Sequence, residues 1–219
     1  MTRRVLVFGA SGHGKVVADV ARAAGHELAG FVDDDPERQA AGLWGLPVIG
    51  WDECVRRGDD LGRPVIALGI GDNRARERVF ERVLADGFEV VTVVHPSAVV
   101  APRARLGDGV VVMALAAVNP DAEVAAGAVL NTGCVVEHDC RVGRFAHLSP
   151  SSALGGGVAI GDRVHLGLGA VVLPLVKVGA DARVGAGAVV HRAVAPGVTV
   201  AGVPARVLEA GEIAGATRK

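Results

Sequence analysis

The hydrophobic residues of this chain follow two different patterns, which meet near residue 94. After that point every sixth residue is Val, Leu or Ile, without interruption from Val94 to Val190. The residue four positions after each of these is Ala, Val, Cys or Ser, and no insertion or deletion breaks the period. Neither an α-helix nor a simple strand has a six-residue period, whereas a fixed period indicates stacked structural repeats. The second part of the chain is therefore predicted to be a repeat array.

Three six-residue units of this kind resemble one triangular coil of the hexapeptide-repeat proteins. The resemblance implies a left-handed parallel β-helix, in which the aliphatic residue points inward and the small residue fills a corner. Each coil buries its apolar surface only against its neighbours, so such an array is stable as a stack. We expect the Gly that often follows the aliphatic position to relieve strain in the turns. These glycines are Gly107, Gly143, Gly155, Gly161, Gly167, Gly179 and Gly185.

The first part of the chain alternates short apolar runs with amphipathic or charged segments. This pattern predicts strands at residues 5–8, 28–32, 65–68 and 90–94, and helices at residues 15–24 and 74–86. Strands that alternate with helices favour a small parallel sheet. We therefore predict an α/β, Rossmann-like N-terminal domain over residues 1–93. The left-handed β-helix, with a C-terminal tail, is predicted over residues 94–219.

The composition fits this division and disfavours several classes of function. Half of the residues are apolar, but only 3% are aromatic, as expected for coils packed with small and β-branched side chains. The formal net charge is −1 and no basic stripe is present, so we expect no nucleic-acid partner. The longest apolar run, residues 110–118, is about half of a bilayer span, so we expect no membrane insertion. Three cysteines without a CxxC spacing fit a reducing compartment, and we expect a cytoplasmic protein.

Local motifs narrow the resemblance to one family. The first motif is Gly9-Ala-Ser-Gly-His-Gly-Lys15 with Phe31-Val-Asp-Asp34. The second is Asn131-Thr-Gly-Cys-Val-Val-Glu-His-Asp-Cys-Arg-Val-Gly143 with His147-Leu-Ser-Pro150, and Ala201-Gly-Val-Pro-Ala-Arg206 resembles the family's closing loop. Over nearly its whole length the chain resembles the hexapeptide-repeat acetyltransferases of nucleotide-linked 4-amino sugars (bacillosamine, perosamine) and their sialic acid O-acetyltransferase relatives. The resemblance implies acetyl-CoA as co-substrate and a homotrimer with active sites between neighbouring prisms.

The resemblance also assigns nucleotide binding to the N-terminal domain. Glycines let a backbone approach phosphate, and the N-terminus of a helix favours an anion. The loop mimics a Walker A motif, but Val16 stands where Ser or Thr would hold Mg²⁺, and its spacing differs from the GxGxxG of dinucleotide sites. A turn that needs Gly for its backbone alone is a further alternative. The residues that match the family's substrate motif here are Ser11, Gly12, His13, Asp33 and Asp34.

An acid–His–acid cluster interrupts the repeat at Glu137, His138 and Asp139, where neighbouring units often carry Gly or Ala. In the resembling enzymes a His at this position is the general base that takes a proton from the sugar amine during attack on the thioester. Imidazole suits this task because its pKa lies near neutral pH. We assign Asp139, and with less support Glu137, to fixing the tautomer of His138. No acyl-enzyme is needed, because amine and thioester react directly once they are held together.

The resemblance gives further residues roles around this base. Asn131 opens the matching motif and is expected to position substrate. His147 lies half a coil beyond His138, so it would reach the same site only across a subunit interface. Residues expected on the acetyl-CoA side are His147, Gly156, Leu168 and Lys177, whose ammonium could meet a CoA phosphate.

Three classes of function stay open at this level. The first is N-acetylation of a nucleotide-linked 4-amino sugar, with O-acetylation of a sialic acid or related hydroxyl as its alternative. The second is a hydratase of the zinc carbonic anhydrase type, but the spacing of His138, His147 and His165 does not match that family's ligands, so no metal is expected. The third is a non-catalytic β-helix, against which the acid–His–acid cluster argues. The sequence does not distinguish UDP, GDP and dTDP sugars.

Overall fold

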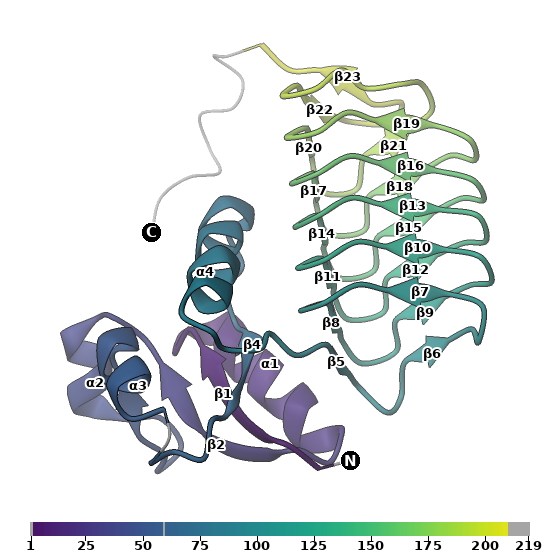
Figure 1. The fold of residues 1–219 in the computed structure, drawn as a ribbon. Helices are drawn as coiled ribbons and strands as arrows, with labels where there is room; N and C mark the ends of the chain where they lie inside the picture. The colour runs from purple at the N-terminus through teal and green to yellow at the C-terminus, as the bar shows by residue number, and fades with distance from the viewer. Residues whose placement is uncertain (1, 59, 210–219) are drawn as a thin grey trace.

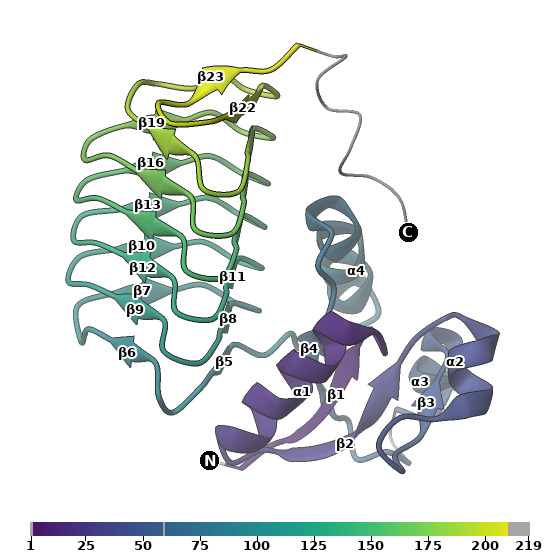
Figure 2. The same cartoon turned by 180° about the vertical axis from the view of Figure 1, so that it is seen from behind.

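A small α/β domain lies beside the lower part of a tall β-prism in the computed structural model, which describes residues 2–58 and 60–209 (Figures 1 and 2). The α/β domain has a four-stranded parallel sheet in the order β3-β2-β1-β4. Its strands are β1 (Arg4–Phe8), β2 (Glu27–Val32), β3 (Val48–Ile49) and β4 (Val65–Leu68). Its helices are α1 (Gly12–Ala23), α2 (Pro36–Ala41), α3 (Trp51–Arg56) and α4 (Asn73–Ala85). The Rossmann-like prediction for this part is confirmed.

Each face of this sheet packs into a separate hydrophobic core. One core joins Val5 and Val7 of β1 to Val17 of α1 and continues to Val111 and Val129 on the prism. The other joins the opposite side of the sheet to α3, α4 and one aromatic residue of the prism, and includes Leu6, Phe8, Trp51, Phe80 and Phe145. Helix α1 is therefore sandwiched between its own sheet and the prism.

Two expectations for this domain were wrong in detail. Residues 90–94 do not form one strand of its sheet, because Val90 makes only an isolated bridge with Ile66, whereas Val93–Val94 form β5, which pairs with the prism. The apolar run is shared because Val90 and Val93 pack into different cores. Helix α1 begins at Gly12 instead of residue 15, since the glycines of the loop extend into its first turn. The short elements α2, α3 and β3 carry too few residues to show a period.

The second part of the chain is a three-sided prism, and the prediction of a left-handed β-helix is confirmed. Pairs such as His147 and His165 lie in register one coil apart. An eight-stranded sheet contains β5 (Val93–Val94), β8 (Val111–Val112), β11 (Val129–Leu130), β14 (His147–Leu148), β17 (His165–Leu166), β20 (Arg183–Val184), β22 (Thr199–Ala201) and β23 (Arg206–Val207). A six-stranded sheet contains β6 (Val99–Val100), β9 (Ala117–Val118), β12 (Val135–Val136), β15 (Ala153–Leu154), β18 (Val171–Val172) and β21 (Val189–Val190). A five-stranded sheet contains β7 (Arg105–Leu106), β10 (Glu123–Val124), β13 (Arg141–Val142), β16 (Ala159–Ile160) and β19 (Lys177–Val178).

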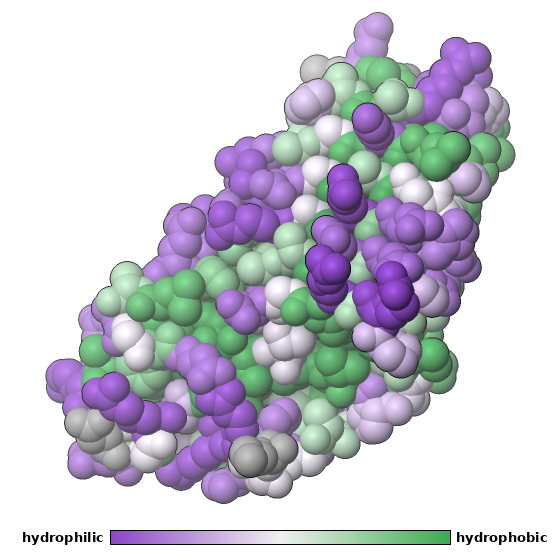
Figure 3. All heavy atoms as spheres, turned by 45° about the vertical axis from the view of Figure 1, so that its right-hand side comes forward, coloured by the Kyte–Doolittle hydropathy of each residue, from purple (hydrophilic) through white to green (hydrophobic). Residues whose placement is uncertain are grey.

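The interior of the prism is built from the two positions that the six-residue period singles out. Aliphatic residues such as Leu130, Leu148 and Leu166 are fully buried, and so are small residues such as Ala128 and Cys134. One side of the surface carries hydrophilic side chains along much of the prism, beside smaller hydrophobic areas (Figure 3). The part of the expected C-terminal tail at residues 210–219 lies outside the described residues.

The glycines that follow the aliphatic position have a different purpose from the one expected. Their backbone is not in the left-handed region, which is occupied instead by the residue three positions after the aliphatic one, for example Gly127 at φ +66°. At Gly143 a Cβ would lie 2.5 Å from the backbone of the next coil, and at Gly161 the same distance is 2.5 Å. These glycines are needed because adjacent coils approach closely at that point, so the expectation of turn strain was wrong.

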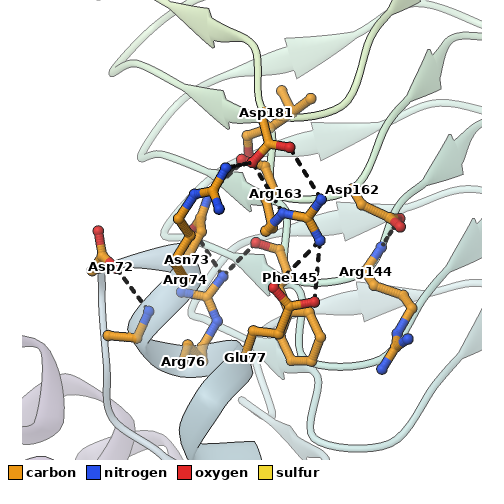
Figure 4. A network of polar contacts seen from close by, with 12 residues as sticks. Asp72, Asn73, Arg74, Arg76, Glu77, Arg144, Phe145, Asp162, Arg163 and Asp181 are labelled. Carbon is orange, nitrogen blue, oxygen red and sulfur yellow. Dashed lines mark hydrogen bonds and ion pairs between the residues drawn. The ribbon is translucent and has the colours of Figure 1, made fainter. Parts of the chain in front are cut away.

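One corner of the prism receives helix α4. The turn residues of successive coils at this corner are Gly127, Phe145, Arg163 and Asp181, all with positive φ. Phe145 packs its ring on Phe80 of α4, with centroids 5.4 Å apart. A bulky residue with positive φ is strained by about 1 kcal/mol or more, and here the interdomain contacts hold it in place. This corner fixes the position of the α/β domain (Figure 4).

Polar contacts extend the same junction along the prism. Arg163 forms ion pairs with Glu77 of α4, at 3.1 Å, and with Asp181 of the next coil, at 3.0 Å. Arg74 also contacts Asp181, at 2.7 Å, and the amide of Asn73 donates to the carbonyl oxygen of Arg163 at 2.9 Å. Helix α4 is therefore attached to several consecutive coils (Figure 4).

Candidate active site

His138 and Asp139 lie in the turn between β12 and β13, at the corner between the six-stranded and five-stranded sheets. His138 Nδ1 is 2.7 Å from Asp139 Oδ2, and the two side chains are 62% and 66% exposed. The hydrogen bond to Asp139 raises the pKa of His138, and the nearby charges of Asp139 and Glu137 add to this effect. Because Nδ1 faces the carboxylate, Nε2 is the ring nitrogen that remains to accept a proton. An exposed imidazole of raised basicity is suited to accept a proton from a bound molecule.

Gly156 stands one coil above His138 and makes room for its ring. A Cβ at Gly156 would lie 2.6 Å from both Cε1 and Nε2 of His138. The absence of a side chain at this position therefore determines where the imidazole lies. Gly156 and His138 are brought together by the eighteen-residue coil, whereas Gly156 was expected from the sequence only on the acetyl-CoA side.

The Gly-rich loop after β1 is close-packed against the loop after β4. Gly9 has φ +111°, and a Cβ at Gly14 would lie 1.8 Å from the carbonyl oxygen of Gly9, so these two glycines serve the backbone. A Cβ at Gly12 would meet nothing within 4 Å. Ser11 is the N-cap of α1 but makes no side-chain capping hydrogen bond. The start of α1 thus presents amide groups, an uncommitted hydroxyl and open space, which together suit an anionic ligand.

The two aspartates after β2 have partners inside the domain. Asp33 is 9% exposed and accepts from the backbone amide of Ala10 at 2.9 Å and from Arg38 at 2.7 Å. These hydrogen bonds and the Arg38 charge lower the pKa of Asp33, although its burial acts in the opposite direction. Asp34 accepts from the amide of Trp51 at 2.8 Å and pairs with Arg82 at 3.0 Å. Asp33 therefore ties the Gly-rich loop to the end of β2.

The rings of three histidines lie side by side where the α/β domain meets the prism. The ring of His147 lies between those of His13 and His165, with centroid distances of 5.6 and 5.0 Å. Burial lowers the pKa of His147 to about 3 and that of His13 to about 4, and the charge of Arg76 acts in the same direction. His147 Nε2 is 3.1 Å from Asn131 Nδ2. This junction lowers the pKa of its imidazoles, whereas the corner at His138 raises it.

The remaining predicted residues lie on separate parts of the prism. Lys177 begins β19 on the five-stranded sheet, while Leu168 lies in the turn between the eight-stranded and six-stranded sheets and is 61% exposed. His147, expected on the acetyl-CoA side, is 7% exposed and faces the Gly-rich loop. Within one chain the structure thus brings together His138, Asp139 and Gly156, and separately His13, Asn131 and His147.

One part of this junction had no role in the sequence analysis. The carbonyl oxygen of Gly71, in the loop after β4, lies 3.3 Å from His147 Nδ1, and a Cβ at Gly71 would lie 3.9 Å from His13. The sequence Gly69-Ile-Gly71 directly after a buried strand was the signal, because parallel strands bring the loops at their carboxyl ends to one edge. Among residues 2–58 and 60–209, no group of three or more His, Cys, Asp or Glu is placed to hold a metal ion.

Comparison with known proteins agrees with this arrangement. A family model described as the PglD N-terminal domain matches residues 4–83. The crystal structure of PerB from Caulobacter crescentus in complex with CoA and GDP-perosamine is 45% identical, with a TM-score of 0.88 over 94% of this chain and 97% of that one. The acetyltransferase domain of PglB from Neisseria gonorrhoeae is 38% identical, with a TM-score of 0.88 over 94% of this chain and 100% of that one.

A curated relative extends the comparison to part of the chain. The UDP-N-acetylbacillosamine N-acetyltransferase of Bacillus subtilis is 35% identical over 115 residues, which are 51% of this chain and 52% of that protein. The chain thus spans about half the length of this relative, whereas it matches the solved structures almost from end to end. The chain therefore belongs to the family of hexapeptide-repeat sugar acetyltransferases that contains PerB and the PglB acetyltransferase domain, as the sequence motifs predict.

Proposed function

We propose that this protein transfers an acetyl group from acetyl-CoA to the amine of a nucleotide-linked 4-amino sugar. The observation that carries the proposal is the exposed His138–Asp139 pair, whose ring is placed by Gly156. It is supported by 45% identity to a structure with CoA and GDP-perosamine bound and by a match to a UDP-N-acetylbacillosamine N-acetyltransferase.

The reaction is a direct attack with His138 as general base. The sugar nitrogen forms a bond to the thioester carbon, and the bond from that carbon to sulfur breaks. His138 Nε2 takes the proton that the amine loses, and the leaving thiolate gains a proton to give CoA. Asp139 holds Nδ1 and stabilises the imidazolium while it carries this proton. Glu137 adds a more distant negative charge.

The nucleotide binds, in this proposal, at the start of α1. The amides of Gly12 and His13 point from the first turn, the hydroxyl of Ser11 is free of a capping bond, and the space at Gly12 admits a phosphate. Asp33 and Asp34 contribute mainly by shaping the loop, since both carboxylates already have partners. His147 contacts His13 and Asn131, which favours a place for all three residues beside the acceptor sugar. His147 was first expected on the acetyl-CoA side.

Acetyl-CoA would then lie between two prisms. Gly156 and Lys177 lie at the five-stranded sheet of the prism, whereas Leu168 lies in the turn between the eight-stranded and six-stranded sheets. One acetyl-CoA molecule therefore contacts all three positions only when it is flanked by two copies of the chain. The outward residues of the six-stranded sheet are all Val or Ala, from Val99 to Val189, whereas the five-stranded sheet presents charged residues such as Arg105, Glu123 and Arg141. The apolar face supports self-association, and we propose a homotrimer that places His138 beside a neighbour's prism.

Light scattering after size-exclusion chromatography tests this assembly. We expect three times the chain mass for the natural sequence and the mass of a single chain for Val135→Asp, which puts a charge in the centre of the apolar face. Glu123→Gln, on the charged face, should leave the mass unchanged. A single-chain mass for the natural protein would refute the homotrimer.

The activity is tested by thiol release from acetyl-CoA with UDP-, GDP- and dTDP-linked 4-amino sugars and with free sialic acids. Turnover of one nucleotide amino sugar, lost in His138→Ala, is expected and would identify the nucleotide. Turnover of sialic acid alone would move the protein to the O-acetyl branch of the family. If none of these compounds caused thiol release, the substrate class would be refuted. Activity that survives His138→Ala would refute the mechanism.

We also propose that the protein acts in the cytoplasm, where acetyl-CoA and nucleotide sugars are available. Cys54, Cys134 and Cys140 are free and buried, and burial raises the pKa of Cys134 to about 12, so these thiols serve packing. No helix in the described part of the chain combines the length and apolar character needed to cross a membrane.

A further inference from the structure

Arg76 of helix α4 is completely buried, and among residues 2–58 and 60–209 its guanidinium hydrogen-bonds to carbonyl and amide oxygens and to no carboxylate. Its Nε donates to the carbonyl oxygen of Gly127 at 2.8 Å, and its Nη2 donates to that of Phe145 at 2.7 Å. Nη1 donates to the carbonyl oxygens of Ile70 at 2.9 Å and Gly71 at 3.1 Å. One guanidinium thus connects the prism to the loop after β4, and Figure 4 shows its contact with Phe145.

Burying a guanidinium to join two domains costs free energy. A buried charge loses its hydration, and apolar residues of the same volume are often equally good or better for stability. The ion pair of the exposed Arg74 and the half-buried ion pair of Arg163 already attach α4 to the same corner. The special property of Arg76 is that its planar guanidinium holds several N–H donors in a fixed arrangement. It can therefore donate hydrogen bonds to carbonyl oxygens on two segments at once. This geometry favours precise placement of the loop at residues 70–71.

The carbonyl group of Gly71 passes this placement on to His147. Because a carbonyl oxygen only accepts, His147 Nδ1, 3.3 Å away, must carry the proton. Its Nε2 then accepts from Asn131 Nδ2 at 3.1 Å. The orientation of the Asn131 amide is consistent with this, since its Oδ1 accepts from the backbone amide of Thr132 at 2.8 Å. The chain of contacts runs from Arg76 through Gly71 and His147 to Asn131.

We propose that Arg76 is a positioning residue for the acceptor sugar, which acts by fixing the carbonyl groups of Ile70 and Gly71 and, through Gly71, the Nδ1–H tautomer of His147 and the orientation of Asn131. This inference rests on the proposed function, because it gives the surroundings of Gly71, His13 and Asn131 to the nucleotide-linked sugar. His138 and the acetyl-CoA side lie outside this chain of contacts.

Steady-state kinetics of Arg76→Lys and Arg76→Met, with Arg163→Met as matched control, test the role. Lysine keeps the charge but cannot reach both segments, and Arg163 joins α4 to the prism without contacting residues 70–71. We expect both Arg76 variants to raise KM for the sugar nucleotide by about tenfold or more, with KM for acetyl-CoA within about twofold. Arg163→Met should leave both KM values near those of the natural protein. Equal effects of Arg76→Lys and Arg163→Met would overturn the proposal.

A measurement on the unaltered protein keeps the test independent of folding defects and of the substrate. Nitrogen-15 NMR of the histidine side chains distinguishes the two neutral tautomers. The signals of His147 are assigned as those that disappear in His147→Gln. We expect His147 in the Nδ1–H form at neutral pH, and in a mixture of forms in Arg76→Lys. The Nε2–H form in the natural protein would overturn the proposal even if the sugar acetyltransferase activity is established. Absence of turnover with the Nδ1–H form present would instead refute the proposed function alone.

Discussion

The corner at His138 and the junction at His147 use the same side chain in opposite environments. His138 is exposed and hydrogen-bonded to a carboxylate, which raises its pKa, whereas His147 is enclosed between two domains and its pKa falls to about 3. Both extend from one prism, half a coil apart. The repeat therefore supplies positions only, and the chemistry of each imidazole is decided by what the rest of the chain places against it.

Replacement of His138 by Asn is the strongest way to separate the two sites. We expect kcat to fall by about 10²–10⁴, the usual contribution of a general base. The free energy of unfolding should change by less than about 0.5 kcal/mol, because the side chain is exposed. Assays of thiol release and thermal unfolding check both effects. His26→Asn, beyond the end of α1, is the control that should keep full activity.

Asp139→Asn tests whether the carboxylate sets the basicity of His138. Because the hydrogen bond to Asp139 raises the pKa of His138, its loss lowers that pKa. The acid limb of the profile of kcat/KM against pH should therefore move to lower pH, and the plateau should fall by about tenfold to a hundredfold. Glu137→Gln should produce a smaller shift, since Glu137 acts only through its charge. An acid limb that stays in place in Asp139→Asn would contradict the assignment.

Gly156→Ala probes the placement of the same ring without changing its chemistry. The added Cβ would overlap Cε1 and Nε2 of His138, so the imidazole must move. We expect a loss of about tenfold in kcat, because small displacements of a catalytic group are costly. In a double-mutant cycle, Gly156→Ala should have no further effect on kcat in the His138→Asn background. Additive effects would show that Gly156 acts elsewhere, for example on acetyl-CoA.

The same contrast explains what the sequence could predict. The prism and the His138 corner follow from a period that repeats every coil, so an interruption such as Glu137-His-Asp139 is visible in the sequence. The junction is formed by contacts between residues far apart in the chain. Arg76 lies in a charged helix whose pattern suggests a solvated face, although it is completely buried.

Phe145 and Arg163 are the local signal for this junction that the sequence analysis missed. They are bulky residues at a turn position where other coils carry Gly or Asp. Gly127 makes room for Phe145, because a Cβ at Gly127 would lie 2.2 Å from the ring of Phe145. Such departures from a repeat mark the surface where another domain docks, but they do not identify the residues of the partner.

The pH dependence of stability tests the same contrast through folding instead of catalysis. A buried histidine whose pKa is lowered in the folded state stays neutral while the unfolded chain takes up protons below its ordinary pKa near 6.5. Stability is then lost as pH falls from about 6.5, until the pKa of the folded state is reached, near 4 for His13 and near 3 for His147. Each such group contributes up to about 1.4 kcal/mol per pH unit. His147→Gln should therefore flatten the decline in unfolding free energy between pH 6.5 and 4, measured by urea denaturation.

His138 should act in the opposite direction in the same experiment. Its pKa is raised in the folded state, so its contribution is present below the ordinary histidine pKa and is lost as pH rises through the raised value. His138→Gln should therefore remove a small gain in stability as the pH falls toward about 6.5, which makes the decline slightly steeper at its start, while His147→Gln makes the decline below pH 6.5 shallower. Because His138 is exposed, its effect is the smaller one. If both variants changed the slope in the same direction, the two histidines would share one environment, and the division between an open catalytic corner and a closed junction would be wrong.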